Sequence, residues 1–195
     1  MLVLAKASPL GRSPPKKYVD HLVVAPDAST IAMEAQSGGI YSVWISRKGG
    51  QASDAKLIAD NARHPEWSPD GKWIVYQSLA DNPGRVVARG YPGGGIVQIS
   101  EDAGSHPVWP RGNTIYYEAG QNIMAATVAP SGAGLAVTGR RILWRGKSAS
   151  ARGDSEFANY DVAPNGDLLV LETTSTGRNK VVVELNWTSG LGKKQ

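Results

Sequence analysis

Short runs of β-branched and aromatic residues, separated by Gly, Pro and polar residues, follow one another along the chain. In the clearest case an apolar element ends at Trp67, a Ser-Pro-Asp-Gly-Lys segment follows at 68–72, and a second apolar run covers 73–77. Pro presets φ in a turn, Asp tolerates turn geometry, and Gly adopts a positive φ without steric cost. The stretch 64–78 therefore predicts two strands joined by a tight turn.

This pattern occurs four times. Proline opens each turn, a turn former usually follows, and then come Gly or Ala, a polar residue, a four-residue strand core and Glu or Gln. Successive opening prolines are 43, 41 and 54 residues apart. A β pattern with a period of about 40–45 residues is typical of propeller blades. The turn residues predicted to have a structural role are Pro26, Asp27, Pro69, Asp70, Gly71, Pro110, Gly112, Pro164, Asn165 and Gly166.

Each repeat also contains candidates for the remaining strands of a blade. Third strands are predicted at 40–45, 85–89, 122–128 and 180–187, and outer strands at 56–58, 96–99 and 141–144. The Gly/Ala/Ser-rich stretches 129–139 and 146–156 are predicted to be loops. The fourth repeat lacks a candidate for its outer strand.

We therefore predict an all-β fold, a β-propeller of four-stranded antiparallel blades with about four blades in this chain. The blades are expected at about 18–60, 61–101, 102–145 and 156–189, after a leader or linker at 1–17 and before a basic tail at 190–195. Either the four blades are the C-terminal part of a larger propeller, which is the favoured interpretation, or residues 2–6 lend a strand that closes the ring.

Composition excludes several classes of protein. The 195 residues include no Cys, so disulfide and thiol chemistry are absent. The net charge of +4 comes from dispersed basic residues, whereas a nucleic-acid binder would cluster its cations; we therefore predict no nucleic-acid partner. No apolar run approaches the length of a membrane-spanning helix, and residues 1–7 do not form a secretory signal.

The sequence contains no candidate nucleophile, metal site or cofactor motif. There is no Gly-x-Ser-x-Gly elbow, no kinase motif, and no His or carboxylate pair at zinc-ligand spacing. His64 and His106 are each followed by Pro and lie 42 residues apart, a regularity that favours a structural role; the third histidine is His21. The glycine-rich segment Gly90–Gly95 lacks the Lys-Ser/Thr end of a phosphate-binding loop. The Arg-Gly-Asp sequence at 152–154 matches an integrin-type adhesion motif, but a match this short arises readily by chance.

The aromatic residues are predicted to fill the space between twisted sheets. Large apolar side chains in strand positions are more often core than ligand contacts. A ring of side chains at the narrow end of the blades could still bind a peptide or a small ligand, although the sequence does not identify its residues. The predicted blade-core residues are Trp67, Trp73, Tyr76, Trp109, Tyr116 and Trp187.

The repeat resembles the TolB-like, Pro-Asp-Gly class of WD-repeat-related β-propellers, most closely at 64–78 and overall across about 18–187. In finer detail it is similar to the C-terminal propeller of bacterial transmembrane serine/threonine kinases. That narrower match is carried by the runs 91–100, 105–117, 160–166 and 181–187. Two turns depart from the family pattern, because Ala28 replaces the preferred Gly and the third turn has no aspartate.

The resemblance implies a non-catalytic recognition or sensor module that binds a protein or a small ligand in the extracytoplasmic part of a bacterial signalling protein. Any catalytic domain, or further blades, would then lie outside this chain. The resemblance leaves two alternatives open, a TolB-like periplasmic scaffold for protein partners and the propeller of a prolyl-oligopeptidase-type serine peptidase. A fold alone does not decide among them.

Overall fold

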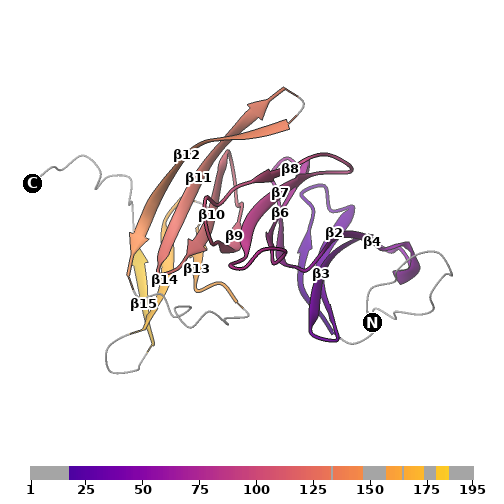
Figure 1. Ribbon diagram of the computed structural model, residues 1–195, viewed down its shortest axis with the longest axis horizontal. Coiled ribbons are helices and arrows are strands. Elements are labelled where there is room, and N and C mark those ends of the chain that lie inside the picture. Colours follow the sequence, from indigo (N-terminus) through magenta and orange to yellow (C-terminus); the bar gives the residue numbers. More distant parts are fainter. Residues whose placement is uncertain (1–17, 133, 147–156, 164, 174–178, 185–195) are drawn as a thin grey trace, which may run out of the picture.

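The computed structural model describes residues 18–132, 134–146, 157–163, 165–173 and 179–184 of the chain. Within these ranges the protein is built from antiparallel β-sheets that follow one another in an arc, with β1 and β15 in the sheets at its two ends (Figure 1). Each sheet is a simple meander in which consecutive strands are hydrogen-bonded neighbours. This is the architecture of successive propeller blades.

We number the four sheets as blades in chain order. Blade 1 contains β1 (Tyr18–Val24), β2 (Thr30–Ser37), β3 (Ile40–Arg47) and β4 (Lys56–Asp60), with the 3₁₀ turn η1 (Ala52–Asp54) before β4. Blade 2 contains β5 (Ala62–Trp67), β6 (Trp73–Ser78), β7 (Arg85–Gly90) and β8 (Ile96–Gln98). Blade 3 contains β9 (Ser105–Val108), β10 (Thr114–Ala119), β11 (Asn122–Ser131) and β12 (Gly134–Arg145). Blade 4 contains β13 (Tyr160–Val162), β14 (Leu168–Thr173) and β15 (Asn179–Glu184).

The predicted Pro-Asp-Gly turns join the first strand of each blade to the second. In blade 2 the Gly71 amide donates to the Ser68 carbonyl at 2.9 Å, and Gly71 has a φ of +68°. The Asp70 carboxylate also accepts from the amide of Lys72, two residues later. Blade 1 forms the same bonds, but its positive-φ position holds Ala28, with a φ of +56°. The predicted backbone geometry of Gly71 is therefore confirmed.

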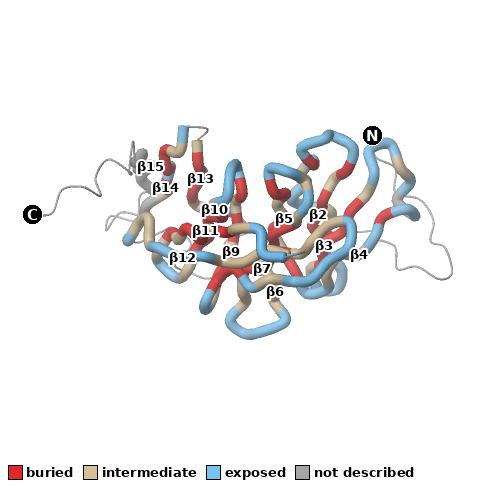
Figure 2. The backbone as a smooth tube through the Cα atoms, turned by 90° about the horizontal axis from the view of Figure 1, so that it is seen from above, coloured by how far each residue is buried: buried red, intermediate tan, exposed pale blue. Residues whose placement is uncertain are grey.

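Apolar side chains on both faces of the second strands hold neighbouring blades together. In β6, Ile74 and Tyr76 face a core shared with blade 1, whereas Val75 faces a core shared with blade 3. Tyr116 in β10 likewise belongs to the core between blades 3 and 4. Successive strand residues point to opposite faces, so burial on both faces requires the uninterrupted apolar runs of the repeat. Figure 2 shows the buried positions concentrated between successive sheets.

Two arginines connect the outer parts of adjacent blades. Nη1 of Arg89 in β7 donates to the carbonyl oxygen of Ile58 in β4. One blade later, Nε of Arg140 in β12 donates to the carbonyl oxygen of Ile99 at 2.7 Å. Blades 2 and 3 are thus each bonded through an arginine to the outer edge of the preceding blade.

Blade 3 corrects one sequence-based expectation. The stretch 129–139 was expected to be a loop, but it belongs almost entirely to the long hairpin of β11 and β12, which extends beyond the other strands (Figure 1). Val128 pairs with Val137 and Pro130 pairs with Leu135. The alternating residues Leu135 and Val137 pack against the core between blades 2 and 3. This alternation stabilises a strand in a segment whose Gly and Ala content is typical of a loop.

The other strand predictions agree with the structure to within a few residues. Third strands form at β3, β7, β11 and β15, and outer strands at β4, β8 and β12. Residues 2–6, the proposed closing strand, lie outside the described residues, as do 147–156, Pro164 and Trp187.

Replacing Gly71 by Val is expected to lower the free energy of unfolding by about 2 kcal/mol, because an L residue with positive φ is strained and a β-branched one more so. The opposite change, Ala28→Gly, should raise it by about 0.5–1 kcal/mol, because the strain at a φ of +56° is removed. Urea unfolding followed by tryptophan fluorescence measures both effects.

Gly139→Val provides the matched control. Gly139 lies in β12 without a positive φ, and a Cβ built there meets no atom within 4 Å. If Gly71→Val and Gly139→Val had the same midpoint of unfolding, the proposed strain at the turn would be contradicted.

Candidate functional site

Three histidines occupy the same place in three successive blades. His21, His64 and His106 lie in the first strands β1, β5 and β9, each where the pairing with the second strand is interrupted by a bulge or irregularity. All three have a left-handed backbone, with φ values of 48°, 52° and 48°. Such a φ is uncommon for residues other than Gly, and His is among the side chains that adopt it more readily. We call these residues the histidine column.

The imidazole rings of the column contact one another across the blade boundaries. The ring centroids of His64 and His106 are 4.2 Å apart, and those of His21 and His64 are 5.7 Å apart in an edge-on arrangement. His64 is only 3% exposed and the His106 side chain 7%, whereas that of His21 is 34% exposed. The column therefore runs from the solvent-accessible side of blade 1 into the interior.

Buried glutamates accompany the histidines. Glu34 and Glu118 are each 2% exposed. Each lies in the second strand of its blade and pairs with the residue just before the histidine in the first strand. Oε2 of Glu118 lies 3.3 Å from Nδ1 of His106, in the same blade. Its other oxygen accepts the backbone amide of Asn159, in blade 4, at 3.0 Å. The carboxylate thus joins two blades.

Glu34 makes the corresponding connection between blades 1 and 2. Its Oε2 accepts the backbone amide of His64 at 2.9 Å, and its Oε1 accepts Nε of Arg63 at 3.1 Å. The guanidinium group of Arg63 also stacks on the ring of Tyr41, 3.8 Å from the ring centroid. A buried carboxylate that accepts two hydrogen bonds, one from a cation, is well compensated for its loss of hydration.

His64, the middle residue of the column, has little capacity for acid–base catalysis at ordinary pH. Burial is the largest cause that lowers its pKa, and the neighbouring His106, Arg63 and His21 act in the same direction; together they bring the pKa from 6.5 to about 2. The imidazole is consequently neutral at ordinary pH. Nε2 of His64 has no hydrogen-bond partner among the described residues. In the same part of the chain, no group of three His, Cys, Asp or Glu side chains is arranged to hold a metal ion.

The sequence identified two members of this column and missed the third. His21 lies five residues before Pro26, as His64 lies five residues before Pro69. Counting back five residues from Pro26, as from Pro69, would have revealed it, whereas the shorter third turn places His106 four residues before Pro110. The same count reaches Asn159 in the fourth repeat, whose amide makes the contact with Glu118.

A groove lies on the side of the molecule that carries the Pro-Asp-Gly turns, which we call the turn face. It has a volume of about 630 Å³ and separates the turn of blade 2 from the turn and the long hairpin of blade 3. Trp73 and Trp109 form part of its wall, and Leu135 and Pro130 contribute from the hairpin. The indole N–H of Trp109 donates to the Gly112 carbonyl at 3.1 Å, so its polar group is already satisfied.

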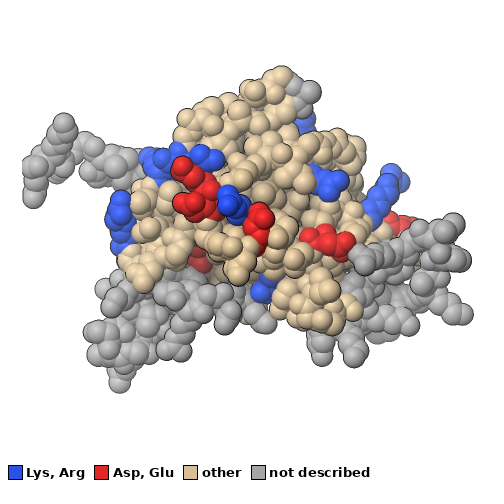
Figure 3. Space-filling model, in the orientation of Figure 1, with Lys and Arg blue, Asp and Glu red and all other residues tan. Residues whose placement is uncertain are grey.

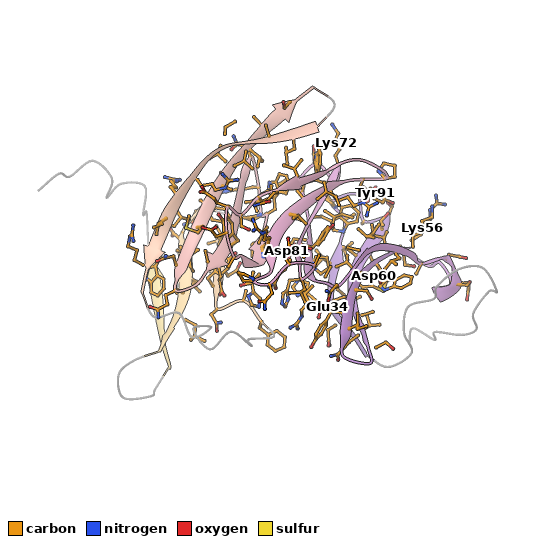
Figure 4. The ribbon with its side chains drawn as sticks, viewed as in Figure 1. Glu34, Lys56, Asp60, Lys72, Asp81 and Tyr91 are labelled. Carbon is orange, nitrogen blue, oxygen red and sulfur yellow. The ribbon has the colours of Figure 1, made fainter. Side chains whose placement is uncertain are left out.

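A second, smaller hollow lies between the turns of blades 1 and 2. Its volume is about 320 Å³, and Asp27, Asp70, Trp67 and Tyr91 are among its lining residues. Trp67 and Tyr91 meet edge to face, with ring centroids 5.0 Å apart. Asp70 lines both hollows, so the two adjoin at the blade 2 turn. Figure 4 shows Lys72 and Tyr91 on this side of the molecule and Glu34 farther from it.

The structure separates the predicted site residues into two groups. Trp67, Tyr76, Trp109 and Tyr116 are at most 6% exposed and belong to the cores between blades. Trp73 is only partly buried, and one side of it lines the groove. Of the predicted turn residues, those that line a hollow on the turn face are Pro26, Asp27, Pro69, Asp70, Gly71 and Gly112.

The remaining predicted features are the other turn residues, the glycine-rich turn and the Arg-Gly-Asp segment. Pro110 is exposed in the blade 3 turn, and Asn165 accepts the amide of Asp167 in the blade 4 turn. Gly166 has a φ of +95°. Gly90–Gly95 joins β7 to β8 as a blade turn. The Arg-Gly-Asp segment at 152–154 lies outside the described residues.

Comparison with known proteins identifies the fold. No protein-family model matches the sequence, and no curated protein does. Among solved structures, oligogalacturonate lyase in complex with manganese aligns with a TM-score of 0.60 and 14% identity over 86% of this chain and 48% of its own. TolB from Acinetobacter baumannii aligns with a TM-score of 0.57 and 14% identity over 85% of this chain and 40% of its own.

A third similar structure is that of a candidate 6-phosphogluconolactonase from Bacteroides uniformis. Its TM-score is 0.52, with 19% identity over 88% of this chain and 57% of its own. This chain thus spans about two fifths to three fifths of the length of these three structures. At such identities the likeness shows a shared TolB-like β-propeller fold, and this fold carries both enzymes and proteins that are not enzymes.

Replacing Glu34 by Ala is expected to lower the free energy of unfolding by about 3 kcal/mol, because the Arg63 guanidinium and the His64 amide lose their buried acceptor. Glu34→Gln should cost less, about 1 kcal/mol, since the amide oxygen still accepts one of these bonds. Gln77 occupies the corresponding position in blade 2, where it pairs with Arg63. Equal losses for the two variants in urea unfolding would contradict the hydrogen-bonding role of Glu34.

His64 should make stability depend on pH. Its pKa is lowered from 6.5 to about 2 by folding, so the unfolded chain binds a proton that the folded protein excludes. This contribution to stability is fully present above pH 6.5 and is lost as the pH falls below it, by about 2 kcal/mol between pH 7 and pH 5.

The test is urea unfolding at both pH values for the wild type and for His64→Asn. Asparagine tolerates a left-handed backbone and stands at the corresponding place in blade 4. The variant should lose about 2 kcal/mol less stability between the two pH values. Parallel pH profiles would show that His64 is not the responsible group.

Proposed function

We propose that this chain is a non-catalytic β-propeller module that recognises a segment of a protein or peptide. The observation that carries the proposal is the groove on the turn face. It combines apolar and aromatic walls with a few polar side chains, including Asp70, Lys72 and Asn113, at its edge. Sites that bind ligands commonly combine an apolar, concave surface with a few polar groups that determine orientation.

The long hairpin of β11 and β12 supports the same proposal. It is longer than is needed to pair with β10, and its outer part supplies Val128, Pro130 and Leu135 to the groove. Extensions from one repeat onto a shared face are a common way for repeat folds to build a binding surface. The fold shared with TolB is consistent with such a scaffold, although fold alone does not determine function.

The distribution of charge favours a protein partner over nucleic acid. On the face shown in Figure 3, Lys and Arg side chains are interspersed with Asp and Glu side chains. Nucleic-acid binding would call for a continuous basic surface. Among the described residues, no helix has the length and hydrophobicity needed to cross a membrane.

We further propose an extracytoplasmic setting in a bacterial signalling protein, on the strength of the resemblance to the propellers of transmembrane kinases. Two other settings share the same module, a periplasmic TolB-like scaffold and a propeller that accompanies a serine peptidase. The full-length gene distinguishes the three settings, through an upstream kinase and membrane segment, a lipoprotein partner or a downstream hydrolase domain.

Site-specific photo-crosslinking tests the recognition role. A photoreactive amino acid at position 72, where the Lys side chain is 76% exposed at the groove, should capture a discrete partner polypeptide in the producing cell. The control position is Asp81, which is 71% exposed and does not line the groove. Asp81 and Lys72 lie beyond opposite ends of β6. Identical products from both positions, or turnover of a peptide, lactone or oligogalacturonide by the purified chain, would contradict the proposal.

A further inference from the structure

The two hollows of the turn face adjoin at the turn of blade 2. Asp70 lines both of them, with the smaller hollow on its blade 1 side and the groove on its blade 3 side. An extended peptide rises about 3.3 Å per residue, so a short segment is enough to cross from one hollow to the next. A single extended segment can therefore reach both hollows.

The smaller hollow carries two carboxylates. Hydrogen bonds from the amide and the hydroxyl of Ser29 lower the pKa of Asp27. Partial burial raises the pKa of Asp70, but hydrogen bonds from Ser68 and Lys72 outweigh it and leave the pKa below its ordinary value. Both side chains are consequently anionic at neutral pH, and both are exposed enough to meet a ligand.

Aromatic rings complete this hollow. Trp67 donates its indole N–H to the Val23 carbonyl at 3.2 Å and meets Tyr91 edge to face. A cation is attracted to the face of such a ring, and the attraction is stronger where carboxylates are close. The protein uses the same pairing within its own structure, where the guanidinium of Arg63 lies over the Tyr41 ring beside Glu34.

Lys72 pairs with one of these carboxylates. Its Nζ lies 3.9 Å from Oδ2 of Asp70, but the Lys72 side chain is 76% exposed. An exposed pair of this kind contributes little and is readily exchanged for another cation. The exposed carboxylates of Asp27 and Asp70 can therefore both accept a cation from a partner.

We propose that the turn face binds an extended, basic segment of a partner protein. An arginine or lysine of that segment lies between Asp27 and Asp70 against Tyr91, and the apolar residues next to it lie in the groove against Trp73 and Leu135. This inference rests on the proposed recognition function and adds the chemistry of the partner.

Three labelled peptides of Pro-Leu repeats test the inference by fluorescence anisotropy. They carry two arginines, two glutamines or two glutamates at the same positions. The arginine peptide should bind about tenfold more tightly than the glutamate peptide at low salt, with the glutamine peptide between them. High salt should reduce this difference, because exposed charges are screened.

Asparagine variants identify the carboxylates responsible. Asp27→Asn and Asp70→Asn should each weaken binding of the arginine peptide about threefold and leave the glutamine peptide unchanged. The turns should tolerate both changes, since Asn165 accepts the corresponding amide in blade 4. Asp81→Asn removes the same charge from a position that lines neither hollow and should have no effect. Leu135→Ala should weaken all peptides that bind.

The contrary outcomes separate this inference from the proposed function. If the arginine and glutamine peptides bound equally and Leu135→Ala weakened both, the groove would recognise peptides but the basic partner would be wrong. If Asp81→Asn weakened binding as much as Asp70→Asn, the attraction would be general and the assigned position would be wrong. If no peptide bound and position 72 captured no partner, both proposals would fail.

Discussion

The arrangement of the blades depends on the hydrogen bond between the buried Glu34 carboxylate and the backbone amide of His64. The left-handed conformation of His64 interrupts the pairing of β5 with β6. A buried amide without a partner costs about 1–3 kcal/mol, so the bulge is stable only when another group accepts from it. In this protein the acceptor comes from the preceding blade. A local irregularity of one strand thus determines where the next blade is placed.

A second bond from a backbone amide to a buried carboxylate joins blades 3 and 4, where Glu118 accepts from Asn159. It is reinforced by the Tyr160 hydroxyl, which donates to the His106 carbonyl at 2.7 Å. The histidines lie beside these carboxylates, and burial holds the pKa of His64 well below its ordinary value. The buried carboxylates Glu34 and Glu118 thus join the blades, whereas Asp27 and Asp70 on the turn face are exposed to a ligand.

The turns and strands could be predicted because their signals are local. Pro69, Asp70 and Gly71 are consecutive, and each has a conformational preference that acts within the turn. The extended hairpin was missed because its Gly and Ala residues obscure the alternation of Leu135 and Val137. The groove and the smaller hollow could not be predicted, since Trp73 and Leu135 lie far apart in the sequence and meet only through the packing of blades. Counting from the repeat could have located His21, but not its contact with His64.

The arginine bonds between blades have a consequence for how the molecule opens. Arg89 and Arg140 each reach back to the blade before them, and the apolar cores also join only consecutive blades. Such an array behaves like a one-dimensional chain of units with nearest-neighbour coupling. Amide hydrogens in β6 and β10, in blades with a described blade on each side, are then protected by two interfaces. A partner bound across blades 1 to 3 would add contacts across two of these interfaces and so restrain the separation of one blade from the next.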